Sequence, residues 1–174
     1  MPFVNKKEMS YRTVAYFKNH ATGYDPVIQS CNRILEENFN LPLRLSYRPD
    51  LLMVAKSNDD IVGLLLLHHT ESTGAWEIGT VSVVKGQPQG KLYEILIQGA
   101  YDAIGVLQNH GILERVWMVK RVRHADKSCL DFFKGLGFKC PSTWVENVIS
   151  NEGYVPFDPF EAFLLKRAVV PGHA

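Results

Sequence analysis

The chain has 174 residues, of which 46% are hydrophobic and 21% charged, and a formal net charge of +1. This length and composition predict a single globular domain over residues 1–174 and argue against a disordered chain. A charge so close to zero gives no bulk attraction to nucleic acid or to an acidic membrane, so neither is an expected partner. The longest apolar run, from Ile61 to Leu67, is too short to cross a bilayer.

Cysteine usage and the first residues of the chain bear on its compartment. The three cysteines, Cys31, Cys129 and Cys140, are odd in number and widely spaced. That pattern favours reduced thiols over a disulfide framework. The first seven residues contain no apolar signal core. We therefore expect a cytoplasmic protein, and we expect no metal site because the Cys and His residues lack ligand spacing.

The first half of the chain contains one predicted helix and four predicted strands. Asp25 and Pro26 mark the start of the helix, as an N-cap followed by a first helical residue. Apolar residues at helical spacing continue this helix to Phe39. Residues 58–60 form the turn of a predicted hairpin. The predicted strands are Tyr11 to Phe17, Leu51 to Ser57, Ile61 to His69 and Trp76 to Val84, the last three forming an antiparallel meander.

The second half alternates helices and strands. The amphipathic helix after Gly90 has an apolar stripe from Leu92 to Leu107, and Gly111 is placed to take a left-handed cap. A short helix from Lys127 to Leu136 is predicted behind a capping Asp126. The predicted strands are Glu114 to Val122, Phe138 to Ile149 and Phe160 to Ala168. This order of elements predicts the α/β or α+β class, a mixed sheet with helices on both faces.

Residues 84–92 connect the fourth predicted strand to the long helix through a turn that contains Gly86 and Gly90. The first turn of a helix carries N–H groups with no intrahelical partner, and the helix dipole adds partial positive charge there. A strand that leads through a glycine-bearing turn into a helix is therefore typical of a phosphate or pyrophosphate site. The alternative is a plain turn into a helix.

In this arrangement the chain resembles the GNAT superfamily, the Gcn5-related N-acetyltransferases. The family's Gln/Arg-x-x-Gly-x-Gly/Ala turn is matched by Gln87-Pro88-Gln89-Gly90-Lys91-Leu92. Its later Asn-x-x-Ala-x-x-x-Tyr-x-x-x-Gly-Phe motif is matched in spacing by Asp126, Cys129, Phe133, Gly137 and Phe138. The resemblance implies a mixed, mostly antiparallel sheet of six to seven strands, with helices on both faces and with strands four and five splayed apart at a bulge.

The resemblance also implies acetyl-CoA as cosubstrate, with a place for each of its parts. The pantetheine arm would pair with the exposed edge of the fourth strand, near Val81 to Lys85. The pyrophosphate would rest on N–H groups from Gln87 to Leu92, with a cation from Lys91 nearby. The implied cofactor-binding residues are Val81, Val83, Lys85, Gln87, Gln89, Gly90, Lys91, Leu92, Asp126 and Phe133.

Four residues depart from the family pattern. Leu92 stands where the family has Gly or Ala, and Pro88 has no N–H to offer. Asp126 replaces an Asn and can still cap a helix, but its ionised side chain donates no hydrogen bond. Phe133 stands where many members have a Tyr that protonates the leaving thiolate, so this acid role is vacant or has moved to another group.

Glu77 is the candidate catalytic residue. It lies on the fourth predicted strand, ten residues before Gln87, near where several members of the family carry a carboxylate base. A carboxylate in a partly apolar cleft can take the proton that an acceptor ammonium must lose before it attacks a thioester. The alternative is a structural carboxylate, exposed or paired with a nearby Lys or Arg.

The sequence thus predicts an N-acyltransferase that moves acetyl from acetyl-CoA to a primary amine by direct attack in a ternary complex. Two alternatives stay open: a catalytically weak or inactive protein of this fold that binds a partner, and an acyltransferase that acts on a macromolecule such as nucleic acid. The second draws on a basic cluster at residues 120–127, for which a solvated loop is the plain explanation. The expected acceptor is a small-molecule or peptide amine, with residues 150–159 as a candidate acceptor loop, and a homodimer is compatible with the sequence.

Overall fold

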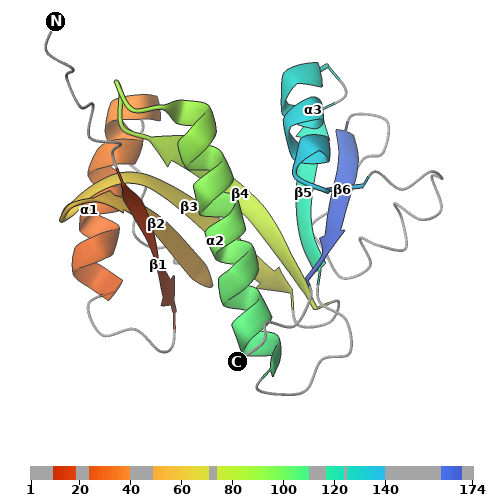
Figure 1. Cartoon of the computed structure of the whole chain (residues 1–174), viewed down its shortest axis with the longest axis horizontal. Helices are drawn as coiled ribbons and strands as arrows, with labels where there is room; N and C mark the ends of the chain where they lie inside the picture. The colour runs from red at the N-terminus through yellow and green to blue at the C-terminus, as the bar shows by residue number, and fades with distance from the viewer. Residues whose placement is uncertain are drawn as a thin grey trace, which may run out of the picture.

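The structure is a computed structural model that describes residues 10–18, 24–39, 49–70, 74–109, 117–123, 125–139 and 162–169. In chain order its elements are β1 (Tyr11–Phe17), α1 (Tyr24–Phe39), β2 (Leu51–Ser57), β3 (Asp60–Thr70), β4 (Ala75–Val83), α2 (Gln89–Asn109), β5 (Trp117–Arg123), α3 (Lys127–Gly135) and β6 (Ala162–Ala168). The strands form one six-stranded sheet in the order β1-β2-β3-β4-β5-β6 (Figure 1).

The sheet is mixed and mostly antiparallel, as predicted. Neighbouring strands are antiparallel from β1 to β4 and again between β5 and β6. Among the described strands, β4 and β5 alone run parallel, and they pair there over three residue pairs. The predicted hairpin of β2 and β3 is confirmed, with Asn58 at its turn in a left-handed conformation (φ 54°).

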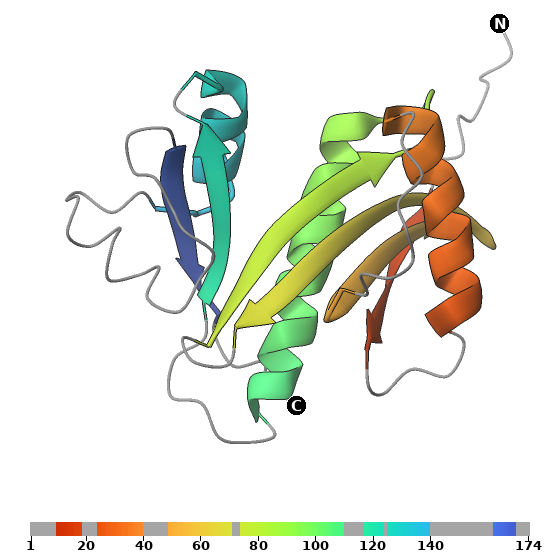
Figure 2. The same cartoon turned by 180° about the vertical axis from the view of Figure 1, so that it is seen from behind.

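Helices cover both faces of this sheet, which confirms the predicted layers. α1 lies on one face, where Ile28 and Leu35 pack with Val54 and Leu64 of the sheet (Figure 2). α2 and α3 lie on the other face, where Leu96 of α2 and Phe133 of α3 belong to one larger apolar core. The apolar stripe predicted for α2 is buried over most of its length: Leu92, Leu96, Ala100 and Ile104 are each at most 1% exposed, whereas Leu107 at its end is 39% exposed.

The caps of α3 agree with the sequence, whereas α1 begins at Tyr24, so Asp25 lies within that helix and is not its N-cap as predicted. Asp126 Oδ1 accepts a hydrogen bond from the N–H of Cys129 at 3.1 Å, so it caps the start of α3 as predicted. Gly137 follows this helix at φ 90°, and the N–H of Phe138 returns to the carbonyl of Phe133 at 3.1 Å. α2 begins at Gln89, slightly earlier than predicted, because the carbonyl of Pro88 already accepts the N–H of Leu92.

Several predictions fall wholly or partly outside the described residues. They concern the cap at Gly111, the start of the predicted strand at residues 114–116, most of the predicted strand at residues 138–149, and the acceptor loop at residues 150–159. Within the described part of the 138–149 strand, Lys139 forms an isolated antiparallel bridge with Lys166 of β6.

Candidate functional site

A bulge interrupts β4 near its middle. Leu67 of β3 pairs with Ile78 of β4, but Leu65 pairs with Val81, so the single residue between them on β3 faces two residues on β4, Gly79 and Thr80. An extra residue in one strand shifts the alternation of its side chains. Trp76 and Ile78 point into the α2 core before the bulge, and Val81 and Val83 point to that same core after it. The bulge therefore re-aims the second half of β4.

β4 and β5 separate at this bulge. Their parallel ladder holds Ala75, Trp76 and Glu77 against residues 117–119 and goes no further in the described residues. Beyond it the two backbones diverge, with residues 78–83 of β4 on one side and residues 120–123 of β5 on the other (Figure 1). We call this divergence the wedge, and the end at Glu77 its closed end. The predicted splaying of strands four and five at a bulge is confirmed.

A pocket of about 440 Å³ lies at the open end of β4, where the strand turns into α2. Cavities of this size are typical of small-molecule sites. Five of the predicted cofactor-binding residues line it, namely Val81, Val83, Lys85, Gln87 and Gln89. Its other lining residues are Asn38, Ser82, Val84, Gly86 and Tyr93. The structure thus brings half of the predicted cofactor residues to one cavity.

The turn after β4 leaves fewer N–H donors for a pyrophosphate cradle than the sequence predicts, because two of them bind carbonyls of the protein. The N–H of Gln87 donates to the carbonyl of Val84 at 3.2 Å, and the N–H of Leu92 donates to the carbonyl of Pro88 at 3.1 Å. The first-turn donors that remain are those of residues 89–91, at the positive end of the dipole of α2. A Cβ built on Gly90 would meet nothing within 4 Å, so open space lies over this turn. Gly86, at φ 89°, is the residue that the turn itself requires to be glycine.

Leu92 points away from that cradle, whereas Lys91 lies beside Tyr11 of β1. Leu92 is fully buried in the α2 core, which accounts for its departure from the family's Gly or Ala. Lys91 is exposed, with its ammonium 5.7 Å from the centre of the Tyr11 ring on β1. The Tyr11 hydroxyl in turn donates to Gln87 Oε1 at 3.1 Å, so β1 buttresses the turn.

Asp126 and Phe133, two of the predicted cofactor-binding residues, contact other parts of the protein itself. Asp126 caps α3 through the N–H of Cys129. Phe133 is only 4% exposed and packs edge to face on Phe132 and Phe138, with ring centres 5.5 Å and 5.2 Å away. Phe132 also meets Tyr93, a pocket residue, at 6.3 Å. α3 therefore reaches the pocket through Phe132 and Tyr93.

Glu77 lies at the closed end of the wedge, as the last residue of β4 that pairs with β5. Its Oε1 forms an ion pair with Nε of Arg121 at 2.9 Å, and both side chains are about a quarter exposed, at 24% and 23%. Opposite Glu77 on β3 is His68. Burial lowers the pKa of this imidazole below its usual 6.5, although Asp50 and Glu77 act to raise it. A carboxylate and an imidazole that favours its neutral form therefore lie together on the α1 face.

Lys120 lies inside the wedge. Its ammonium donates to the carbonyl of Gly79 at 3.2 Å and, more weakly, to that of Ile78 at 3.5 Å. Burial lowers the pKa of this lysine, and nearby Cys129, Glu77 and Asp126 act to raise it. The basic cluster at residues 120–127 is thus divided: Lys120 bridges two strands, Arg121 pairs with Glu77, and Arg123 and Lys127 are exposed. His124 lies outside the described residues.

Two of the residues that shape the site gave no usable signal in the sequence. Asn38, at the end of α1, donates from Nδ2 to the carbonyl of Val83 at 2.8 Å and to the hydroxyl of Ser82. It lies more than forty positions from both partners, and no local pattern connects such residues. Lys120 was grouped with its basic neighbours, although strand alternation places it on the opposite face from Arg121.

The described residues contain neither a metal-binding cluster nor a membrane-spanning helix. Among the described residues, no group of three or more His, Cys, Asp or Glu side chains is arranged to hold a metal ion. Within the same residues, no helix has the length and apolar content needed to span a bilayer.

Comparison with solved structures places this geometry among known proteins. Tetrahymena Gcn5 matches with a TM-score of 0.63 at 15% identity, covering 93% of this chain and 98% of that one. This is the GNAT fold. The GNAT-fold ribosomal-protein-S18-alanine N-acetyltransferase of Escherichia coli matches with a TM-score of 0.57 at 12% identity, over 95% of this chain and 96% of that one. The aminoglycoside 6'-N-acetyltransferase of Enterococcus faecium matches with a TM-score of 0.55 at 11% identity, over 94% and 99%.

Sequence comparison by itself does not detect this likeness. No protein-family model matches the chain, and no curated protein sequence matches it. The matching structures act on acceptors as different as a protein alanine and an aminoglycoside. The GNAT fold therefore leaves the acceptor of this protein to be argued from its own residues.

Proposed function

We propose that residues 1–174 form one acyl-CoA-dependent N-acyltransferase domain, which transfers acetyl from acetyl-CoA to a primary amine in a ternary complex. The observation that carries this proposal is the wedge, which runs into a pocket and then into the first turn of α2. A pyrophosphate would lie on the N–H groups of residues 89–91, and the arm of the donor would follow β4 along the pocket. The N-acetyltransferases that share the fold support the same assignment.

The acceptor would approach the closed end of the wedge on the α1 face. There Glu77 would take a proton from the acceptor ammonium, directly or through water, and Arg121 would hold its carboxylate in place. Holding the amine against the thioester would supply most of the remaining rate enhancement. A small-molecule or peptide amine fits this role, since the carboxylate attracts a cation.

A protein that binds acyl-CoA or a partner without transfer is the second candidate. The ion pair of Glu77 with Arg121 favours it, because that carboxylate already has a partner, and so does Phe133, which has no proton to give to a leaving thiolate. Release of CoA in the presence of a panel of primary amines separates the two candidates. If acetyl-CoA binds but no amine of the panel causes release of CoA, the second candidate is favoured.

The donor site is tested by calorimetry with acetyl-CoA. Gly90→Glu places a carboxylate in the open space over the first turn of α2, so we expect affinity to fall at least tenfold, or about 1.4 kcal/mol. Gly135→Glu is the matched control, because Gly135 is also exposed and its Cβ would also meet nothing within 4 Å, but it lies at the end of α3. Absence of binding by the wild type, or equal affinity of a folded Gly90→Glu protein, would contradict the proposal.

A further inference from the structure

Lys120 is the first residue of β5 beyond its ladder with β4. Its ammonium lies 3.2 Å from the carbonyl oxygen of Gly79 and 3.5 Å from that of Ile78, at the bulge where the strands part. A buried main-chain carbonyl needs a hydrogen-bond partner, and here a side-chain cation supplies what the β5 backbone would supply in a continuous ladder. The closed end of the wedge therefore contains a positive charge.

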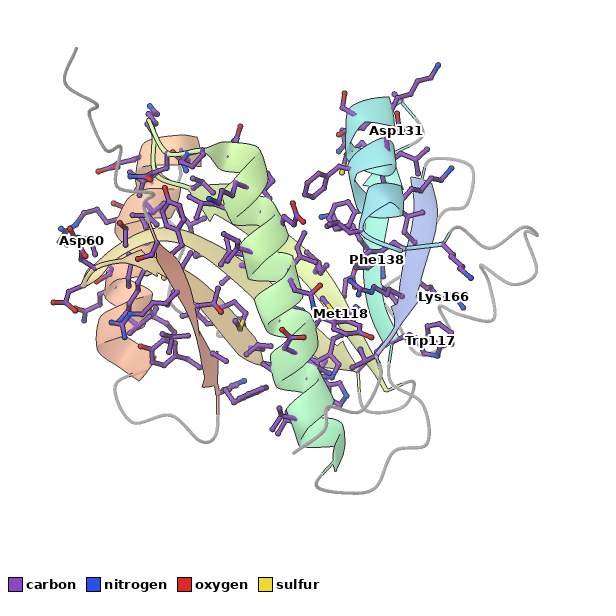
Figure 3. The ribbon with its side chains drawn as sticks, in the orientation of Figure 1. Asp60, Trp117, Met118, Asp131, Phe138 and Lys166 are labelled. Carbon is purple, nitrogen blue, oxygen red and sulfur yellow. The ribbon has the colours of Figure 1, made fainter. Side chains whose placement is uncertain are left out.

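This charge lies on the opposite face of the sheet from Glu77. Lys120 pairs across the ladder with Leu165, which is fully buried in the α2 and α3 core together with Met118 and Val122. Trp117 and Val119, at the alternate positions of β5, belong to a separate cluster, and Trp117 lies beside Lys166 away from α2 (Figure 3). The ammonium thus faces α3, and the carboxylate of Glu77 faces the other side.

The path of an acyl donor leads to this ammonium. An extended arm that starts from the first turn of α2 and follows the edge of β4 passes the pocket residues from Lys85 back to Val81. It then reaches Gly79, about 20 Å from Lys85 at roughly 3.3 Å per strand residue. The strands close there, so the reactive end of the arm has to stop beside Lys120.

The charge of Lys120 acts in favour of a nearby sulfur anion, although at Cys129 burial outweighs it and the pKa of that thiol is raised. The Cys129 thiol on α3 lies within the electrostatic reach of Lys120. Burial also lowers the pKa of Lys120 itself, which makes its ammonium a readier proton donor than an exposed lysine. The titratable groups close enough to act on it are Cys129 and Asp126 from α3 and, from the opposite face of β4, Glu77.

We propose that Lys120 is the acid of the transfer reaction, with an ammonium that meets the leaving thiolate of CoA at the closed end of the wedge. The inference rests on the proposed function. As the amine nitrogen bonds to the acyl carbon, the C–S bond breaks and its electron pair goes to sulfur. Lys120 gives the sulfur a proton and is reprotonated by water. The acceptor ammonium loses two protons in all, so one transfer releases CoA, the amide and one net proton.

The test uses CoA itself and needs no acceptor. Thiolates absorb in the ultraviolet, so the thiol of bound CoA can be titrated from the difference between complexes with CoA and with S-ethyl-CoA, in which the protein's own thiols cancel. We expect the bound thiol to titrate below the ordinary thiol pKa of about 8.5. In Lys120→Met and Lys120→Gln we expect the thiolate to thiol ratio at a given pH to fall at least tenfold.

Lys134 is an exposed lysine on α3, so Lys134→Met is the control. The thiol of CoA bound to this variant should titrate as it does in the wild type. Equal titration of bound CoA in the wild type and in either Lys120 variant would overturn the inference. So would loss of CoA binding by folded Lys120 variants, because Lys120 would then only hold the strands together. If neither variant folds, the wild type decides, since a bound thiol that titrates at or above its free value contradicts the role. Absence of CoA binding by the wild type would overturn the proposed function instead.

Discussion

The sheet has two parts, a first part of β1 to β4 and a second part of β5 and β6. Within each part the strands pair along most of their length, but the two parts are joined by a short ladder. β1 and β2 share seven residue pairs, and so do β5 and β6, whereas β4 and β5 share only three. Side chains of α2 and α3 hold the two parts together where backbone hydrogen bonds between the strands are lacking. Tyr101 of α2 donates to the carbonyl of Ala168 at 3.1 Å, and the centre of its ring lies 4.0 Å from the guanidinium of Arg167; both partners belong to β6.

This difference shows how a continuous core can coexist with a broken ladder. One apolar cluster runs from Leu51 of β2 to Leu165 of β6 on the α2 and α3 face, so burial holds the two parts together. Beyond Glu77, β4 still pairs with β3, but the main-chain groups on its β5 side are left to other partners. In the protein alone Lys120 takes two of the carbonyls. The proposed donor arm would lie along the same edge of β4 and end beside Lys120.

The largest expected effect is at the junction of the two parts. If Glu77 is the base, Glu77→Gln should lower turnover by roughly 10²–10⁴-fold, because the amide cannot take the proton of the acceptor. Binding of acetyl-CoA should change little, since the donor would lie along β4 beyond the bulge. Steady-state kinetics with the best amine acceptor measure both. Wild-type turnover of the variant across pH 6 to 9 would show that Glu77 serves only as the partner of Arg121.

The next effect tests whether the second part depends on the shared core. Phe133→Ala should lower the free energy of unfolding by roughly 3–5 kcal/mol, because it empties the centre of the ring cluster between α3 and the sheet. Phe132→Ala is the matched control and should cost less, because that side chain is only half-buried. Chemical denaturation of both variants gives the comparison. Equal losses would mean that the ring cluster does not anchor α3 through Phe133.

The smallest effect is a pH dependence in the first part. Burial holds the pKa of His68 below 6.5, so on acidification the unfolded chain takes up its proton before the folded chain does. The free energy of unfolding should therefore fall as the pH drops below about 6.5, by less than about 1.4 kcal/mol per pH unit for this one group. In His68→Gln that share of the acid sensitivity should disappear. Parallel stability curves for the two proteins between pH 7 and 5 would contradict this.

Local patterns made most of the fold predictable. The apolar stripe of α2 and the caps of α3 at Asp126 and Gly137 are each set by residues within a few positions of one another. The same locality explains why five of the predicted cofactor-binding residues line one pocket, since Val81 to Gln89 lie on one strand and its turn. The side chain of Leu92 was harder to place, because the family motif favours the cradle and the apolar stripe favours the core. The core is where it lies.

Contacts between distant segments could not be predicted in this way. Asn38 closes one side of the pocket from α1, and Tyr101 joins α2 to β6 at a separation of 67 residues. Lys120 belongs to a run of basic residues in the sequence. Its position inside the wedge could be known only once the separation of β4 from β5 was seen. The ion pair between Glu77 and Arg121 was foreseen as an alternative, but its partner could be chosen only once β5 was seen beside β4.

Hydrogen exchange with and without saturating acetyl-CoA shows whether the donor lies along the free edge of β4, because it reports on each amide of that edge. We expect slower exchange at residues 79–84 and at residues 89–91, the edge and the first turn of α2, with Gly90→Glu losing that protection. Acetyl-CoA that binds by calorimetry yet protects neither segment, or protects only amides far from the wedge, would contradict this position of the donor.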